Sequence, residues 1–429
     1  MRIAVVGSGI SGLLTANLLS REHELTVFEQ EDRIGGHTHT HRVFEQGREL
    51  SIDSGFIVFN DWTYPNFKRL LEQLGVASKA SNMGFSVQDE RSGLEYNGTS
   101  LNALFAQRTN LLRPAFLGMI RDIFRFNKAA LALLERPDDA CSMAEFLERG
   151  KYGRAFKEHY LVPMGAAVWS AAPGAIAEFP AQSFAQFFKN HGFLSVDERP
   201  VWRVVRGGSR SYLQPLCAPF QQRIRRNTPI RSVRRVRDGI ELTTRSGELF
   251  DFDHVVLAAH SDQSLALLAD PSQAEREVLG ALRYQENEAV LHTDARLLPR
   301  RKLARAAWNY HSLKQGASAE QRVAVSYWMN LLQGFEAKEQ YLVTLNHSDA
   351  IDPAKVLARM VYHHPQQTQA SVAAQKRKAS INGVRRTHYC GAYWGFGFHE
   401  DGVVSALDVA KYFGQTLDPR TPQVLESVR

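Results

Sequence analysis

Cysteine is scarce in this chain: only three of its 429 residues are cysteines, and no two are close enough to form a CxxC pair. Cys141, Cys217 and Cys390 therefore provide neither a disulfide framework nor a cysteine-based zinc site. Isolated thiols of this kind are typical of a reducing compartment, so we expect a cytoplasmic protein.

Long apolar runs are also missing. The longest uncharged stretch, residues 161–177, contains two prolines and two glycines and is shorter than the roughly 18–20 apolar residues that span a bilayer. The apolar amino-terminal stretch is interrupted by glycines and followed by Arg21 and Glu22 without a convincing cleavage site, which argues against a signal peptide. We therefore expect a soluble or peripheral protein rather than an integral membrane protein.

No low-complexity tract interrupts the chain, which is 44% hydrophobic and 23% charged, as in ordinary globular proteins. Its length predicts two or three domains, because single hydrophobic cores rarely exceed about 250–300 residues. The formal charge of +7 favours acidic partners. A basic run at residues 231–237 alternates with apolar residues, so we interpret it as the solvated face of a strand and expect no nucleic-acid partner.

The first twenty residues carry the pattern of a dinucleotide-binding unit. A β-branched run at residues 2–6 leads into Gly7-Ser8-Gly9-Ile10-Ser11-Gly12, and an apolar-periodic segment follows. Gly7 permits a tight turn, Gly9 lets the backbone approach a pyrophosphate, and Gly12 allows close packing of helix on strand. The amino terminus of the helix, which includes Ser11, presents unpaired N–H groups to the phosphates.

A second predicted strand, residues 25–29, ends at Glu29 and is followed by Gln30. Glu29 lies 17 positions after Gly12, where a carboxylate can accept both hydroxyls of an adenosine ribose. A free 2′-hydroxyl is implied, because a 2′-phosphate would repel the carboxylate. We predict that Glu29 and Gln30 belong to a nucleotide site; the alternative is a structural turn with a surface glutamate.

The segment EDRIGGHTHT, residues 31–40, resembles the FAD-binding signature of the flavin-containing amine oxidase superfamily, in which Arg, a hydrophobic residue and a Gly pair follow a Glu. The resemblance implies a non-covalent FAD and places Gly35 and Gly36 beside it, with His37 where the family usually has Arg. The stretch SIDSGFIVFN matches the family's Asp-x-Gly beneath the flavin ring, at Asp53, Gly55 and Phe56. The alternative for Gly55 is an ordinary hairpin glycine.

A second glycine-flanked helix start lies near the end of the chain. A predicted strand, HYC, ends at Gly391, and Gly402 opens an apolar-periodic helix. This arrangement resembles the closing FAD motif of the same superfamily, which implies that Gly391 and Ala392 approach the pyrophosphate and ribityl chain. The backbone N–H groups at Gly402 and Val403 would lie near the flavin pyrimidine edge, where reduced flavin gathers negative charge. The family residue that matches Ile230 offers its backbone to the adenine.

His399-Glu400-Asp401 precedes this helix, and we interpret the three residues chiefly as its lead. Asp401 is the expected amino-terminal cap, and it is also a candidate for the ribityl hydroxyls that a family carboxylate holds. A catalytic His399 is the alternative. Consecutive side chains diverge, so we predict no metal site here. Cys390 is expected to be a buried structural thiol rather than a covalent flavin anchor.

These motifs predict an α/β fold, with a doubly wound, Rossmann-like FAD domain of the glutathione-reductase type and an interleaved α+β substrate domain, as in amine oxidases. We expect the FAD domain at residues 1–60, 201–263 and 381–429, the helical part of the substrate domain at 61–200, and its sheet at 264–380. Four aromatic residues of this sheet either wall a substrate tunnel or pack its core: Trp308, Tyr310, Tyr327 and Trp328.

The middle of the chain, including YLVPMGAAVWSAAP and AVLHTDARLLP, resembles a branch of the superfamily that is associated with cyclopropane fatty acid synthase-like methyltransferases. The resemblance implies work on acyl chains and a methyltransferase partner. Amine oxidases of the superfamily usually carry a Lys near flavin N5, but residues 284–295 contain none. His292 or Asn287 could supply a polar or proton-transferring group there; the alternative for His292 is a structural role.

Three functions stay open. The leading hypothesis is an FAD-dependent oxidoreductase in which flavin N5 takes a hydride from a hydrophobic, fatty-acyl or lipid substrate, with O2 or a protein as final acceptor. The second is an amine or polyamine oxidase. The third is a non-catalytic FAD-binding partner of a lipid methyltransferase.

A basic, Phe-rich segment at residues 113–126 also predicts peripheral contact with an anionic membrane. On a helix, Arg113, Arg121 and Arg125 would meet lipid phosphates. Four apolar side chains would then enter the interface: Phe116, Ile120, Ile123 and Phe124. The alternative is an ordinary amphipathic helix whose apolar residues face the core.

Overall fold

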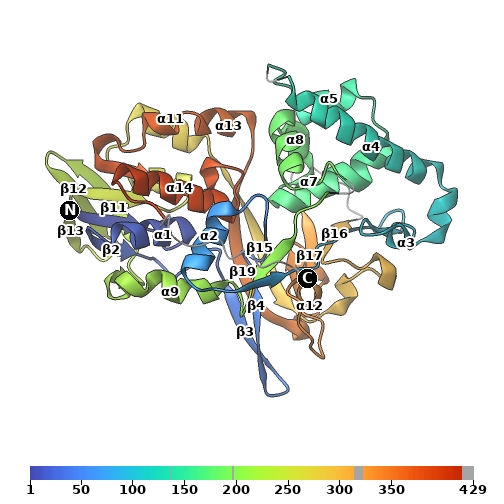
Figure 1. Ribbon diagram of the computed structural model, residues 1–429, viewed down its shortest axis with the longest axis horizontal. Helices are drawn as coiled ribbons and strands as arrows, with labels where there is room; N and C mark the ends of the chain where they lie inside the picture. Colours follow the sequence, from blue (N-terminus) through green and yellow to red (C-terminus); the bar gives the residue numbers. More distant parts are fainter. Residues whose placement is uncertain (137, 196–197, 314–321, 418–429) are drawn as a thin grey trace.

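Two large sheets organise the molecule, one parallel and one largely antiparallel (Figure 1). The structure is a computed structural model that describes residues 1–136, 138–195, 198–313 and 322–417. The last part of the expected FAD domain, residues 418–429, lies outside the described residues. Within those ranges, no helix combines the length and the apolar character needed to cross a bilayer.

The parallel sheet has five strands in the order β10-β2-β1-β14-β20. They come from three distant parts of the chain: β1 (Arg2–Val6), β2 (Glu24–Phe28), β10 (Ile224–Arg225), β14 (His254–Leu257) and β20 (Thr387–Tyr389). Successive side chains of β1 point to opposite faces of the sheet, so Ile3 and Val5 pack in one core and Ala4 and Val6 in another. The sheet is therefore buried on both faces. This is the doubly wound sheet that the sequence predicts.

Helices α1 (Ile10–Leu19) and α14 (His399–Tyr412) lie side by side on the first face (Figure 1). The second face packs against a small antiparallel sheet and three helices: β11 (Ile230–Val236), β12 (Gly239–Thr244), β13 (Leu249–Phe252), α10 (Ser261–Leu267), α11 (Gln273–Gly280) and α13 (Gln369–Gln375). The structure therefore departs from the expected boundaries, because α11 and α13 share a core with the parallel sheet.

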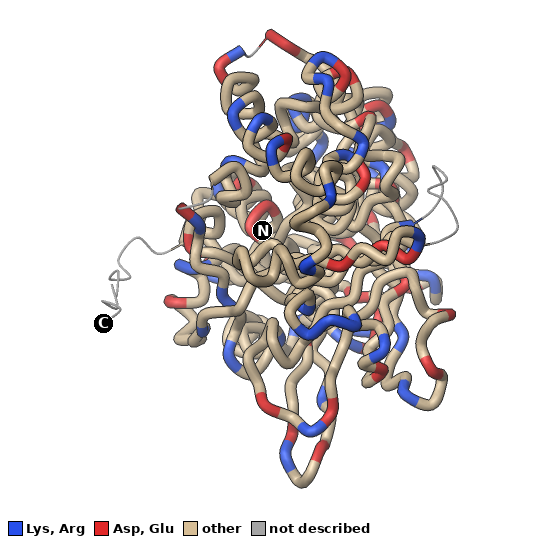
Figure 2. Tube along the Cα trace, turned by 90° about the vertical axis from the view of Figure 1, so that its right-hand side faces the viewer, with Lys and Arg blue, Asp and Glu red and all other residues tan. Residues whose placement is uncertain are grey.

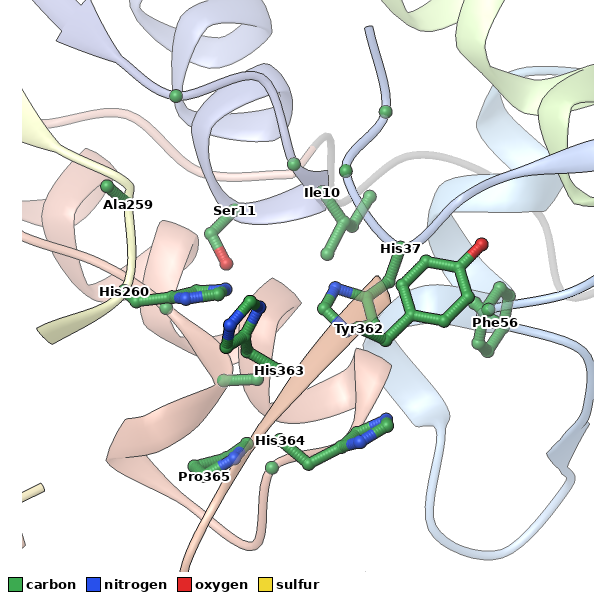
Figure 3. A pocket seen from close by; sticks show the side chains of 18 of the residues that line it. Ile10, Ser11, His37, Phe56, Ala259, His260, Tyr362, His363, His364 and Pro365 are labelled. Carbon is green, nitrogen blue, oxygen red and sulfur yellow. The ribbon is translucent and has the colours of Figure 1, made fainter. Parts of the chain in front are cut away.

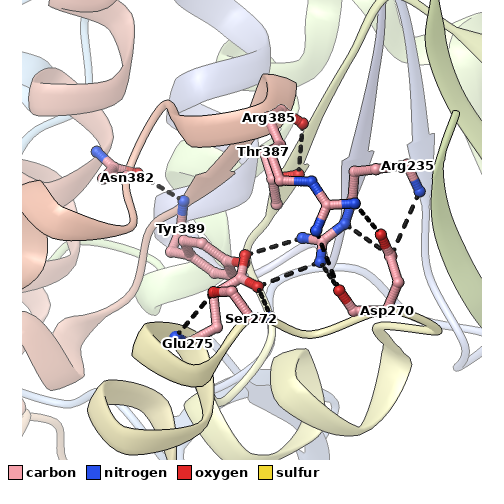
Figure 4. A network of polar contacts seen from close by, with 8 residues as sticks. All are labelled: Arg235, Asp270, Ser272, Glu275, Asn382, Arg385, Thr387 and Tyr389. Atoms are coloured by element: carbon pink, nitrogen blue, oxygen red, sulfur yellow. Dashed lines mark hydrogen bonds and ion pairs between the residues drawn. The ribbon is translucent and has the colours of Figure 1, made fainter. Parts of the chain in front are cut away.

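A buried ion-pair network ties β11, α11 and β20 together (Figure 4). Arg235 donates from Nε to Asp270 Oδ1 at 2.8 Å and from Nη1 to Glu275 Oε1 at 2.8 Å. The hydroxyl of Tyr389 donates to the same Glu275 oxygen at 2.5 Å. Burial raises the pKa of Glu275, but the hydrogen bonds from Arg235 and Tyr389 outweigh it and lower the pKa to about 2. The network fixes the last strand of the sheet to the helix beside it.

The second large sheet has seven strands in the order β19-β15-β18-β17-β16-β7-β8, and all neighbours are antiparallel except β16 and β7. The strands are β7 (Phe85–Asp89), β8 (Leu94–Asn97), β15 (Tyr284–His292), β16 (Trp308–Ser312), β17 (Ala324–Trp328), β18 (Leu342–Leu345) and β19 (Val356–Pro365). The segment 61–200, expected to be helical, thus contributes β7 and β8. The two strands have only five and four residues, whereas the helix at 114–134 has 21, so helical periodicity dominates the segment's pattern.

A helical lobe covers one end of this sheet and consists of α4 (Pro114–Leu134), α5 (Met143–Arg149), α7 (Val162–Trp169) and α8 (Ala181–Asn190) (Figure 1). The prediction that Phe116 enters a membrane interface is wrong, because its side chain is 4% exposed and packs inside the lobe. Ile120 and Ile123 are half-buried, and Phe124 is exposed. The remaining helices are short: α2 (Pro65–Gln73), α3 (Leu101–Leu104), α6 (Arg154–Phe156), α9 (Leu213–Cys217) and α12 (Met329–Leu332).

A charged hairpin, β3 (Thr40–Glu45) and β4 (Arg48–Asp53), projects from the body of the molecule (Figures 1 and 2). Its tip is held by Glu45, which accepts hydrogen bonds from the backbone of Lys338 and Glu339 at 2.8 and 3.0 Å. A small sheet of β5 (Phe59–Asn60), β9 (Trp202–Val205) and β6 (Ser78–Ala80) lies beyond the hairpin in sequence and connects the two large sheets. Basic and acidic residues alternate along the hairpin (Figure 2).

Candidate functional site

A cavity of about 780 Å³ runs between the parallel sheet and the seven-stranded sheet. Its walls come from the start of α1, the loops after β2 and β4, the end of β19 and the start of α14. Most of the residues predicted for a cofactor line it, and so does the catalytic candidate His399. The cofactor residues are Gly7, Gly9, Ser11, Glu29, Gln30, Gly35, Gly36, His37, Gly55, Phe56, Ile230, Gly391 and Ala392. The two glycine-flanked helix starts therefore open into one space.

The glycine-rich turn leaves room for a ligand at one position only. A Cβ on Gly7 would lie 2.7 Å from the carbonyl oxygen of Ala258, and a Cβ on Gly12 would overlap the carbonyl oxygen of Gly7. A Cβ on Gly9 would meet no atom within 4 Å, because it would project into the cavity. Gly9 is the N-cap of α1, so the unpaired N–H groups of that helix begin beside this open space.

Glu29 lies at the end of β2 and lines the same part of the cavity. One carboxylate oxygen accepts hydrogen bonds from the Ser8 backbone N–H at 3.1 Å and from the Ser8 hydroxyl, and the other accepts from the Glu31 N–H at 2.9 Å. The second oxygen keeps a lone pair for a further donor. This position fits a ribose hydroxyl, with Ile230 nearby for the base.

Four histidines surround the middle of the cavity (Figure 3). His37 lies 5.1 Å from Tyr362 and 5.5 Å from His364 between ring centroids, and His363 faces His260 at 5.7 Å. Burial lowers the pKa of His37 to about 3 and that of His260 to about 4, with further contributions from neighbouring histidines and, for His37, from Arg33. The rings of His37 and His260 are therefore neutral, and a bound phosphate would favour their protonation.

The proton on His364 is placed by a chain of hydrogen bonds that starts at the backbone. The N–H of Glu288 donates to Asn346 Oδ1 at 2.9 Å, so Asn346 Nδ2 is the donor to Asn287 Oδ1 at 2.7 Å. Asn287 Nδ2 then donates to His364 Nδ1 at 2.9 Å. Burial lowers the pKa of His364 to about 3, so the ring is neutral and carries its proton on Nε2.

Beyond the histidines, the cavity is apolar and aromatic. Trp308 and Tyr327 face it from neighbouring strands and pack edge to face at 5.0 Å, whereas the structure leaves Tyr310 and Trp328 outside the lining. The other walls of this part are Ile57, Val58, Val168, Trp169, Leu345, Phe396 and Phe398. The described residues around the whole cavity include no lysine, and their only carboxylates are Glu29 and Glu31 at the opposite end.

Helix α14 begins at His399, three residues before the expected start at Gly402. Phe398 is the N-cap, and Asp401 in the first turn accepts its N–H at 2.9 Å, so Asp401 caps the helix from inside it. Glu400 caps a different helix, because its carboxylate accepts the backbone N–H groups of Asn66 and Phe67 at 3.0 and 2.9 Å. The side chains of His399, Glu400 and Asp401 therefore point in three different directions.

His399 is the member of this group that lines the cavity. Its ring stacks on Phe56 at 3.7 Å, and Nε2 lies 2.8 Å from the hydroxyl of Tyr212. Burial lowers the pKa of His399 to about 3, so its ring is neutral. Gly402 and Val403 do not line the cavity; a Cβ on Gly402 would lie 2.9 Å from the side chains of Ile10 and Ser11 on α1. Gly402 thus permits close packing of the two helices.

Asp53 and His292 also lie away from the cavity. The Asp53 carboxylate is enclosed by donors from Thr40 at 2.5 Å, from Ser209 at 2.8–3.0 Å and from Gln333 at 3.0 Å, and burial raises its pKa to about 6. His292 is inside the seven-stranded sheet, where Nε2 lies 2.8 Å from Thr344 Oγ1. Both side chains form their hydrogen bonds within the protein, so both have structural contacts.

Metal and thiol chemistry have no site in the described part of the chain. None of its groups of three or more His, Cys, Asp or Glu side chains could hold a metal ion. Cys390 is fully buried next to Thr15, burial raises the pKa of its thiol to about 12, and it does not line the cavity.

Sequence reasoning missed several lining residues: Ser8, Arg33, Arg245, His260, Tyr284, Tyr362, His363 and His364. The pair His363-His364 before Pro365 could have indicated a site, because two adjacent histidines followed by a proline are uncommon in the core of a sheet. Their meeting with His37 depends on tertiary folding, which no local pattern reports.

A parallel sheet, a glycine-rich turn into α1 and a carboxylate at the end of the next strand define the class of dinucleotide-binding oxidoreductases. Residues 10–347 match the model of the flavin containing amine oxidoreductase family, and the chain belongs to this family. Oxidoreductase chemistry with a bound FAD is what membership of this family implies. The open position at Gly9 and the free lone pair of Glu29 fit this cofactor, whose diphosphate and ribose would lie at those two residues.

Relatives share this family and fold. The chain is 24% identical over 286 residues to a putative flavin-containing monoamine oxidase AofH of Mycobacterium tuberculosis, which covers 63% of this chain and 59% of that relative. The chain thus matches less than two thirds of the relative's length. Among solved structures, cyclohexylamine oxidase from Brevibacterium oxydans has a TM-score of 0.68 at 14% identity, over 96% of this chain and 99% of the other. A fatty acid isomerase from P. acnes has a TM-score of 0.65 at 17% identity, over 96% and 98%.

Proposed function

We propose that this FAD-dependent oxidoreductase oxidises a hydrophobic acyl chain, either as a free fatty acid or within a lipid. One observation carries the proposal: the aromatic part of the cavity, around Trp169, Trp308 and Tyr327, contains no lysine and no carboxylate among the described lining residues. An alkylammonium ion would enter this region without an acidic partner, and burying an unpaired charge is costly. An acyl chain would replace water against apolar walls, which is favourable.

The chain's own polar groups support the same substrate class. His364 carries its proton on Nε2, so it can donate a hydrogen bond to an oxygen atom in the cavity but cannot accept one through that nitrogen. A carboxylate or an ester carbonyl would accept this hydrogen bond, whereas an ammonium group has no lone pair to do so. A bound FAD supplies two-electron oxidation, and the aromatic walls exclude water from the reacting carbon.

Amine oxidation is the second candidate. It is favoured by the relatives, because AofH is named a monoamine oxidase and the Brevibacterium protein is a cyclohexylamine oxidase. The fatty acid isomerase of the same fold supports the first candidate in the same way. The missing lysine argues against the usual amine oxidase arrangement, in which a lysine lies near flavin N5.

Anaerobic bleaching of the flavin absorbance separates these candidates. We expect oleic acid or an oleoyl phospholipid to bleach the holoenzyme, and cyclohexylamine and putrescine to leave it unchanged. Bleaching by an amine alone, with peroxide release in air, would replace the proposal with amine oxidation. No bleaching by any lipid, amine or reduced nicotinamide would favour the non-catalytic partner of a methyltransferase.

A further inference from the structure

We propose that the outer face of α4 binds the surface of an anionic phospholipid bilayer. Six exposed residues follow one another along this helix at spacings of three and four, so they form one stripe that faces solvent. The α4 stripe consists of Arg113, Leu117, Arg121, Phe124, Lys128 and Leu131. Apolar and basic side chains alternate along it.

The stripe differs from the outer face of an ordinary surface helix, which is polar. Leu117, Phe124 and Leu131 are 45%, 57% and 41% exposed. The inner face of α4 is already apolar and buried in the helical lobe, so the outer apolar residues are not needed for that core. The turn before the helix extends the same surface, because Leu112 is 86% exposed.

The charges of α4 identify the partner. The helix has one acidic residue, Asp122, which is buried and accepts hydrogen bonds from Arg125 at 2.7 Å and from the Gly153 N–H at 2.8 Å. Arg121 Nη2 also lies 3.6 Å from the buried Asp122 Oδ1, but the outer face of the described helix carries no acidic residue, so the exposed cations at 113, 121 and 128 give that face a positive charge. Basic and apolar side chains together match phosphate headgroups above acyl chains. A nucleic acid would satisfy only the cations.

This surface is independent of the chemistry in the cavity, because none of the six stripe residues lines it. If the acyl substrate is correct, membrane binding would bring the helical lobe, which also contributes Val168 and Trp169 to the cavity, to the lipid. Binding and catalysis can thus be tested separately.

Flotation of the full-length holoenzyme with vesicles tests the proposal. We expect flotation with phosphatidylcholine vesicles that contain phosphatidylglycerol and much weaker flotation with phosphatidylcholine alone. Replacing the three cations (R113Q, R121Q, K128Q) is expected to weaken binding roughly 100-fold at low salt and to remove its salt dependence. Replacing the three apolar residues (L117Q, F124Q, L131Q) is expected to weaken it at least roughly tenfold.

The matched control replaces two exposed leucines outside α4, Leu249→Gln and Leu303→Gln, which are 63% and 47% exposed. The control variant should float like the wild type, and all variants should keep their flavin and melting temperature. Failure of the wild type to float with either vesicle overturns the proposal, as does equal flotation of wild type and both stripe variants. A stripe-dependent dimer in sedimentation velocity, without flotation, would identify a second copy of the chain as the partner and would also overturn it.

Discussion

Replacing Gly9 with alanine should weaken cofactor binding without unfolding the protein. A Cβ at this position meets no atom within 4 Å, and the backbone angles of φ −69° and ψ 176° suit any L-residue. The added methyl group would instead occupy the part of the cavity where the FAD diphosphate must approach the turn. The expected variant is a folded apoprotein with weak flavin binding.

Two opposing effects set the stability of this variant. Alanine restricts the unfolded chain and stabilises the fold by about 0.4–1 kcal/mol, whereas its loss of N-cap preference relative to glycine costs a similar amount. We therefore expect the free energy of unfolding of the apoprotein to stay within about 0.5 kcal/mol of the wild type. Overpacking against the bound cofactor costs about 1–3 kcal/mol, which weakens FAD binding by about 5- to 150-fold.

Flavin absorbance after purification, an FAD titration of the apoprotein and chemical denaturation measure both quantities. Gly118→Ala is the matched control, because a Cβ on Gly118 also meets no atom within 4 Å but lies on α4, outside the cavity. The control should keep its flavin and gain stability, since alanine is the better helix former. Wild-type FAD affinity in Gly9→Ala would refute the assignment of this turn to the diphosphate.

Three further substitutions test other contacts of the structure. Gly12→Ala should destabilise the apoprotein by at least about 3 kcal/mol in chemical denaturation, because its Cβ would overlap a backbone carbonyl. Glu275→Gln should cost about 1.5–3 kcal/mol, because Arg235 keeps its ion pair with Asp270 but loses the charge of its more deeply buried partner. The lowered pKa of Glu275 means that its stabilisation is complete above pH 4.5 and is lost as pH falls towards 2, so the variant should show less acid dependence of unfolding over that window. Asn287→Asp should move the His364 proton to Nδ1 and raise the pKa of His364 by about 1–3, visible as shifted imidazole ¹⁵N signals; an unchanged tautomer would contradict the hydrogen-bond chain.

The local motifs of the sequence predicted the architecture because their physics is local. A β-branched run, closely spaced glycines and an apolar helix specify a strand–turn–helix unit within twenty residues, and the parallel sheet built on β1 confirms the predicted fold class. Glu29 follows from the same spacing argument, whereas Gly35 and Gly391 were expected from the resemblance to the amine oxidase superfamily; all three line the cavity.

Contacts between distant segments could not be predicted in this way. The Glu400 carboxylate caps α2 through Asn66, which lies 334 positions earlier in the sequence. A carboxylate can cap any helix, so its chemistry did not predict which one. Asp53 fitted the family motif, yet its carboxylate is taken by Ser209 and Gln333, which the sequence gives no reason to connect. His364 was missed because its role depends on Asn287, on the neighbouring strand β15, and on Asn346, just after the next strand, β18.

The wall of the cavity is shared between residues 7–11 and residues 391–399, and this order has a consequence during synthesis on the ribosome. A nascent chain forms its glycine-rich turn early but cannot enclose a flavin until the strand carrying Tyr389 emerges and joins the growing sheet. Until then, the edge of β14 and the apolar side of α1 are uncovered. Cofactor loading therefore waits for the strand that carries Tyr389, and the interval before it is when chaperones would protect this polypeptide from aggregation.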